Sequence, residues 1–185
     1  MENEYTFSVF NQFSGNGIAQ ALKNCNKYNK KPIFICIGSD LVLGDSLGPL
    51  IGTKIKEEKL PVYYYGSLSF PVTAKEIGYV KTYLKEIHPE SFIIAIDAAV
   101  GDENDVGLIR VVDKGIMPGL GVKKRLGKVG DCGIIGIVAK RSYNNVELFN
   151  LTRLNLVYKM SEMILDGIKE YLKYLEKSQD LDKAQ

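Results

Sequence analysis

Two aspartates, Asp45 and Asp97, each follow an apolar run that is typical of a buried strand. Asp45 lies in the stretch IGSDLVLGDSLGP (37–49), and Asp97 closes the run FIIAID (92–97). In open α/β sheets, groups that follow the strands meet at one edge, so both carboxylates are expected in the same crevice. An ionised carboxylate can act as a base while its neighbour, held neutral, acts as an acid. Such a pair can activate a water molecule against a peptide carbonyl, or bind a divalent metal if a third ligand is supplied.

The three glycines of this stretch, Gly38, Gly44 and Gly48, suggest a nucleotide-binding loop, but the neighbouring residues argue against one. A phosphate-binding loop needs a lysine after its last glycine, whereas Gly44 is followed by Asp45, and the GxGxxG spacing is also absent. A carboxylate there would repel a phosphate by roughly 1–4 kcal/mol. The loop is better suited to bringing a carboxylate to a helix N-terminus, where the helix dipole favours the ionised acid.

The elements that must position the two aspartates alternate along the chain. The pattern predicts helices over 16–29, 46–59, 72–87 and about 146–176, and strands over 32–38, 61–66, 91–100, 107–113 and 133–140. Asp45 or Ser46 is expected to cap the second helix, with Pro49 in its first turn. This order predicts the α/β class, as a three-layer α/β/α sandwich with a mostly parallel (mixed) central sheet. We expect a single domain over 1–185, with a polar tail that frays from about 177 to 185.

Composition excludes several classes of partner. The 185 residues are 45% hydrophobic, and the net charge is +2 from 24 basic and 22 acidic residues. This balance favours neither direct nucleic-acid binding nor a membrane surface. The three cysteines are odd in number and lack CxxC spacing, which indicates reduced thiols and a cytoplasmic protein. The N-terminus lacks a signal-peptide pattern, and no apolar run approaches the ~20 residues of a membrane span.

Three motifs resemble the germination protease family of endospore-forming bacteria, and more closely its short YyaC-like sporulation protease relatives. They are GSDLVLGDSLGP, IAIDA and DKGIMPGLGV, and the resemblance covers roughly residues 30–140. Germination proteases degrade the small acid-soluble proteins that protect spore DNA. The resemblance therefore implies a sporulation-associated endopeptidase of aspartic type, in a sporulating cell or forespore. It implies that Asp45 and Asp97 are the catalytic residues.

The broader fold group of this resemblance includes the hydrogenase maturation proteases, which add a metal-binding histidine to two carboxylates. This sequence has one histidine, His88, in the stretch KEIHPE at the expected end of a helix. That position, at a helix end before a proline, does not match the place of the metal-binding histidine in those proteases. We therefore predict neither a metal nor another cofactor.

The predicted partner is a protein or peptide substrate. The residues expected to contact it are Gly44, Ser46, Pro118, Gly119 and Gly121. The last three belong to a glycine-rich, basic loop over 114–132 that could cover the crevice.

Other readings of these residues stay open at this stage. The chain could be a non-catalytic peptide- or anion-binding protein that uses the 114–132 loop, or a metal-dependent maturation-type protease. Asp45 could serve only as a helix cap, and Asp97 only as a strand-end acid. The substrate, the assignment of acid and base, and the choice between monomer and homo-oligomer do not follow from the sequence.

Overall fold

A mixed sheet forms the middle layer of the computed structural model, which describes residues 3–118, 127–141 and 152–183. Its six strands lie in the order β1-β5-β6-β4-β2-β3. Their bounds are Glu4–Ser8 (β1), Pro32–Cys36 (β2), Tyr63–Tyr65 (β3), Phe92–Gly101 (β4), Leu108–Val112 (β5) and Cys132–Lys140 (β6). Strands β3, β2, β4 and β6 pair in parallel, whereas β5 is antiparallel to both β6 and β1. The predicted mostly parallel, mixed sheet is thereby confirmed.

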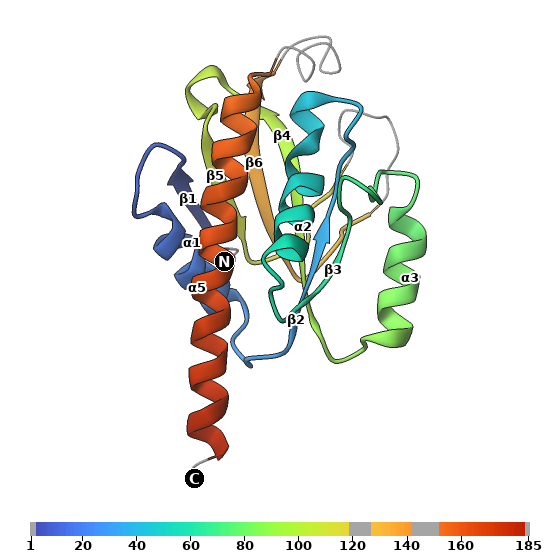
Figure 1. Cartoon of the computed structure of the whole chain (residues 1–185), viewed down its shortest axis with the longest axis vertical. Helices are drawn as coiled ribbons and strands as arrows, with labels where there is room; N and C mark the ends of the chain where they lie inside the picture. Colours follow the sequence, from blue (N-terminus) through green and yellow to red (C-terminus); the bar gives the residue numbers. More distant parts are fainter. Residues whose placement is uncertain (1–2, 119–126, 142–151, 184–185) are drawn as a thin grey trace.

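Helices cover both faces of this sheet, which completes the predicted three-layer sandwich (Figure 1). Helices α1 (Ser14–Cys25), α2 (Leu47–Glu57) and α5 (Leu154–Lys183) pack on one face, and α3 (Ile77–Ile87) packs on the other. Two 3-10 turns, η1 (Leu43–Ser46) and η2 (Glu103–Asp105), come after β2 and β4 in the chain. Within the described ranges, no helix is both long and apolar enough to cross a bilayer.

Strand β2 is apolar throughout because both of its faces are covered. Phe34 and Cys36 belong to the core beneath α1, α2 and α5, whereas Ile33 and Ile35 belong to the core beneath α3. All five residues of β2 are buried. A continuous apolar run is the pattern expected of a central parallel strand.

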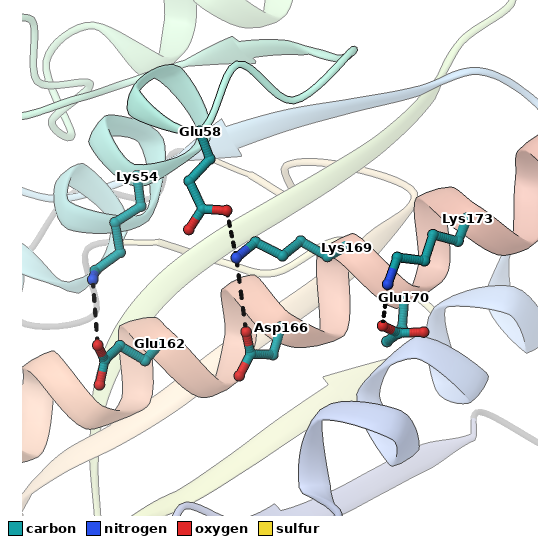
Figure 2. A network of polar contacts seen from close by, with 7 residues as sticks. All are labelled: Lys54, Glu58, Glu162, Asp166, Lys169, Glu170 and Lys173. Carbon is teal, nitrogen blue, oxygen red and sulfur yellow. Dashed lines mark hydrogen bonds and ion pairs between the residues drawn. The ribbon is translucent and has the colours of Figure 1, made fainter.

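Ion pairs lie along α5 and between α5 and α2 at the surface (Figure 2). The pairs are Lys54 with Glu162 (3.9 Å), Lys169 with Glu58 and with Asp166 (3.9 Å), and Lys173 with Glu170 (2.7 Å). Pairs that remain in contact with solvent each contribute only about 0–1 kcal/mol. The contact between these helices therefore depends mainly on the apolar residues buried beneath them.

Some predicted boundaries were wrong. Strand β1 was not expected, yet Glu4–Ser8 pairs with β5 along its length. The third helix begins at Ile77 rather than at residue 72, because Val72 pairs with Ile37 in a parallel bridge. The first helix spans Ser14–Cys25, so it ends earlier than the predicted residue 29.

The last helix also differs from the prediction. It was expected to end near residue 176, but α5 continues to Lys183, so most of the predicted frayed tail is helical. Its predicted start at about 146 lies outside the described residues.

Two glycines allow the loop after β2 and the start of α2 to approach β2 closely. Gly38 has φ +143°, and a Cβ atom there would lie 2.0 Å from the carbonyl oxygen of Asp45. A Cβ atom on Gly48 would lie 2.1 Å from the carbonyl oxygen of Ile37. Both contacts are with backbone, which cannot turn away as a flexible side chain can. The glycines of the loop therefore serve backbone packing beside Asp45.

We predict that Gly48→Ala destabilises the protein by roughly 3 kcal/mol or more, because the methyl group would displace the backbone of Ile37, just after β2. The control is Gly78→Ala, where a Cβ atom would meet nothing within 4 Å. This helical position should gain a few tenths to about 1 kcal/mol. Urea unfolding followed by circular dichroism measures both changes. Equal stabilities of the two variants would show that the close approach is absent.

Candidate active site at the end of β2

The turn after β2 brings Asp45 back beside the strand that the chain has just left. The N–H of Ile37 donates to the carbonyl of Ile96 at 2.8 Å, which holds the end of β2 against β4. The N–H of Ser39 donates to the carbonyl of Asp45 at 3.1 Å. The 3-10 turn η1, which contains Asp45, therefore lies at this edge of the sheet.

Asp97 lies in β4, one residue beyond the contact with Ile37. Ile96 and Ala98 belong to the core beneath α1, α2 and α5, whereas Ala95 belongs to the core beneath α3. Because side chains alternate along a strand, Asp97 lies on the α3 face. Its Oδ1 accepts a hydrogen bond from the N–H of Ala98 at 2.9 Å. Asp97 and Asp45 are both partly buried residues.

The two carboxyl groups interact electrostatically. Burial raises the pKa of Asp45 to about 6, and the Ser39 N–H partly offsets this increase. Burial, and then the negative charge of Asp45, raise the pKa of Asp97 well above its ordinary value, while the Ala98 N–H lowers it. Both carboxyl groups therefore keep their protons to a higher pH than an exposed aspartate does. Unequal sharing of protons between them stays a prediction.

The N-terminus of α2 was expected to favour ionisation of Asp45 through the helix dipole. The net shift in the structure is toward the protonated form, because burial raises the pKa of Asp45. Asp45 also does not cap α2, since it lies in η1 and Ser46 occupies the cap position. The Ser46 side chain makes no capping bond; its hydroxyl donates to the carbonyl of Leu43 at 2.7 Å.

The residues expected to contact a substrate lie mostly below the surface. Gly44, Ser46 and Pro118 are buried. Gly119 and Gly121 lie outside the described residues. Substrate contact by these five residues stays a prediction.

A neighbouring segment that sequence reasoning did not single out also forms this edge. The N–H of Gly38 donates to the carbonyl of Val72 at 3.0 Å, which places the chain before α3 beside the Asp45 loop. Leu41 in that loop is 87% exposed, and Phe70, two residues before Val72, is 77% exposed. Exposed apolar side chains beside a polar site are a feature of binding surfaces. Local sequence periodicity cannot place the segments that contain Leu41 and Phe70 side by side, because the hydrogen bond between Gly38 and Val72 joins residues that are distant in sequence.

The side chains present do not fit a catalytic metal. Within the part of the chain that the structure describes, no group of three histidine, cysteine, aspartate or glutamate residues could hold a metal ion. Catalytic zinc sites normally use three protein ligands, whereas this site offers two carboxylates. His88 follows α3 and contacts the hydroxyl of Tyr65 at 3.2 Å, and it lines a pocket with Phe92 and Ile93 at the start of β4. Cys36 and Cys132 are buried in the core.

We predict that Asp45→Asn stabilises the fold at pH 8 and has little effect at pH 4. A carboxyl whose pKa is higher in the folded state costs nothing below its unfolded pKa, and destabilises the fold as the pH rises toward 6. The variant should therefore gain about 1–2 kcal/mol at pH 8, after allowing for solvent screening of a half-buried group.

The control for this experiment is Asp40→Asn, an exposed carboxylate in the same loop, which should change stability little at either pH. Denaturant unfolding at the two pH values gives the comparison. If Asp45→Asn behaves like Asp40→Asn, burial does not raise the pKa of Asp45.

The chain is similar to proteins of several kinds. Residues 8–167 match the family model described as "Protein of unknown function (DUF1256)". The protein YyaC of Bacillus subtilis (strain 168), described as uncharacterized, is 40% identical over 140 residues, which is 75% of this chain and 68% of that protein. The expected likeness to YyaC is thereby confirmed.

A solved structure also matches, with a lower sequence identity. It is the crystal structure of the [NiFe] hydrogenase maturation protease HycI from Thermococcus kodakarensis KOD1, with 15% identity and a TM-score of 0.40. The match covers 77% of this chain and 97% of that one. A likeness of this size does not bear on activity. The match over residues 8–167 and the identity with YyaC together show that this chain belongs to the DUF1256 family.

Proposed function

We propose that this protein is an endopeptidase in which Asp45 and Asp97 supply the base and the acid. The observation that carries the proposal is the electrostatic interaction between two partly buried carboxyl groups at one edge of the sheet. Burial and the charge of Asp45 raise the pKa of Asp97 well above its ordinary value, and burial raises the pKa of Asp45 to about 6. Strongly shifted pKa values that arise from burial and a specific charged partner are typical of catalytic groups.

The proposed reaction needs only these two groups and a water molecule. Ionised Asp45 takes a proton from the water, whose oxygen forms a bond to the peptide carbonyl carbon. Protonated Asp97 gives its proton to the carbonyl oxygen as negative charge develops there. When the C–N bond breaks, the leaving nitrogen takes the proton held by Asp45, and the diol hydroxyl returns a proton to Asp97. Both carboxyl groups are then in their starting states.

The proposed biological setting is sporulation, and the proposed substrate class is a small spore protein. The support is the resemblance of three sequence motifs to germination proteases. The exposed Leu41 and Phe70 beside the site favour a substrate with apolar side chains near the scissile bond. A cytoplasmic or forespore location belongs to the same proposal.

We predict that Asp45→Asn and Asp97→Asn each abolish cleavage of a small spore protein, because each removes a group that must change protonation. The double variant should be little worse than either single one, since residues that act as a unit are not additive. Asparagine at position 97 keeps the oxygen that accepts the Ala98 hydrogen bond, so the fold should survive. Asp40→Asn is the matched control and should keep full activity.

The assay is cleavage followed by gel electrophoresis and mass spectrometry. Retention of wild-type cleavage by either catalytic variant would overturn the assignment. Saturable binding of the protein substrate without any cleavage by the wild-type chain would instead establish the non-catalytic alternative.

The pH dependence of cleavage provides a second prediction. The value of kcat/KM should rise as the pH passes through about 6, because Asp45 must be ionised to accept a proton. It should fall again at higher pH as Asp97 loses its proton, since the pKa of Asp97 is raised well above its ordinary value. Initial rates at low substrate concentration measure this profile. A rate that is flat between pH 4 and 8 would exclude Asp45 as the base.

A further inference from the structure

We propose that a pocket at the amino edge of the sheet binds a small ligand that carries two or more phosphate groups. The cavity has a volume of about 620 Å³. It lies between α3, Ile35 of β2, the start of β4, the chain after α1, and residues 128–131. Sites for small molecules and cofactors typically have volumes of roughly 300–1,000 Å³. The pocket is thus large enough for such a ligand.

The interior and the rim of this pocket differ in chemistry. Ile35 and Ile93 of the sheet, with Leu84 of α3, give it apolar lining. The charged lining residues are five lysines, Lys27, Lys30, Lys81, Lys85 and Lys128, and one carboxylate, Asp131. This excess of positive charge is large for a chain whose net charge is only +2.

The single carboxylate has a structural role. Asp131 accepts a hydrogen bond from the N–H of Ile93 at 2.8 Å, and its own N–H donates to the carbonyl of Ile93 at 2.7 Å. These two bonds attach residue 131 to the start of β4. Asp131 is therefore engaged with backbone and cancels only part of the lysine charge.

Some of the pocket lysines compensate the partial negative charge of a helix C-terminus, but others do not. Helices α1 and α3 both end at this pocket, and each C-terminus has about half a negative charge. Lys85 in the last turn of α3 and Lys27 just after α1 compensate these ends. Lys30 and Lys81 come from two other places in the chain and have no such role. Their convergence on one cavity leaves a positive potential that an anion would neutralise.

The arrangement favours a compact polyphosphate group over a nucleic acid. Ammonium groups bind phosphate oxygens as point charges, and several of them around one concavity suit adjacent phosphates. Nucleic-acid binding would instead require a basic stripe along an extended surface. Tyr28, 85% exposed at the rim, offers a face for a ring attached to the phosphates.

The pocket is separate from the aspartate pair. Ile93 precedes Asp97 by four residues on the same face of β4, which corresponds to about 13 Å along the strand at roughly 3.3 Å per residue. A ligand in the pocket would leave the carboxyl group of Asp97 accessible. The proposal therefore does not depend on peptidase activity.

Isothermal titration calorimetry with inorganic tripolyphosphate, at about 0.15 M salt, tests the proposal. We expect saturable binding with one site per chain and a Kd below about 100 μM. Lys30→Gln/Lys81→Gln should weaken binding at least about tenfold. The control, Lys56→Gln/Lys159→Gln, removes the same charge from exposed positions that do not line this pocket and should bind as the wild type does. Asp97→Asn should also bind normally.

Three results would overturn the proposal. They are absence of binding at about 1 mM tripolyphosphate, equal weakening by both double variants, and tighter binding of a single-stranded oligonucleotide than of tripolyphosphate. Loss of cleavage in Asp97→Asn with retained tripolyphosphate binding would separate this site from the proposed active site.

Discussion

The packing of the η1 turn against the end of β2 is the constraint on which the rest of the site depends. Backbone approaches backbone at Gly38 and Gly48, where a Cβ atom would meet carbonyl oxygens at 2.0 and 2.1 Å. This contact brings a loop that would otherwise extend into solvent back over the sheet edge. As a result Asp45 loses water, and its charge acts on Asp97 in the next strand. Backbone packing thus determines the electrostatics of the carboxyl pair.

The sandwich maintains this contact from both sides. Cys36 and Leu47 lie in the core beneath α1, α2 and α5, so β2 and the start of α2 are anchored to the same apolar cluster. On the other face, Val72 pairs with Ile37 and Gly38, which ties the chain before α3 to the same turn. The surface ion pairs of α2 and α5 contribute little by comparison. An interior of this kind holds the carboxyl groups in one arrangement and limits the access of water to them.

Much of the fold follows from local patterns, because buried parallel strands are continuous apolar runs. The predicted strands 32–38 and 91–100 correspond closely to β2 and β4, and the layers follow from their alternation with helices. Strand β1 was missed because Glu4–Ser8 lies at the sheet edge and contains only a short, partly polar run. The start of α3 was misplaced because Val72 forms a bridge to Ile37, a contact distant in sequence.

The candidate site was predictable in part for the same reasons. Asp45 follows β2 in the chain, and Asp97 ends the apolar run FIIAID within β4, so a common sheet edge could be expected for them. The direction of the Asp45 pKa shift could not be predicted from the sequence, because it depends on how much water the η1 turn excludes. The lysine-lined pocket at the amino edge of the sheet was also not predicted, because its lysines Lys30, Lys81 and Lys128 come from three separate segments. An overall charge of +2 conceals such a local concentration.

The central claim is that Asp45 and Asp97 titrate as an interacting pair. The most direct measurement is a carbon-13 NMR titration of the aspartate carboxyl groups, in the wild type and in Asp45→Asn. The account predicts that the carboxyl of Asp45 titrates near pH 6, and that Asp97 titrates well above its ordinary range. In Asp45→Asn the pKa of Asp97 should fall, yet stay raised, because burial remains after the neighbouring charge is removed. Both carboxyl groups titrating near pH 4, with Asp97 unchanged by the substitution, would contradict the account.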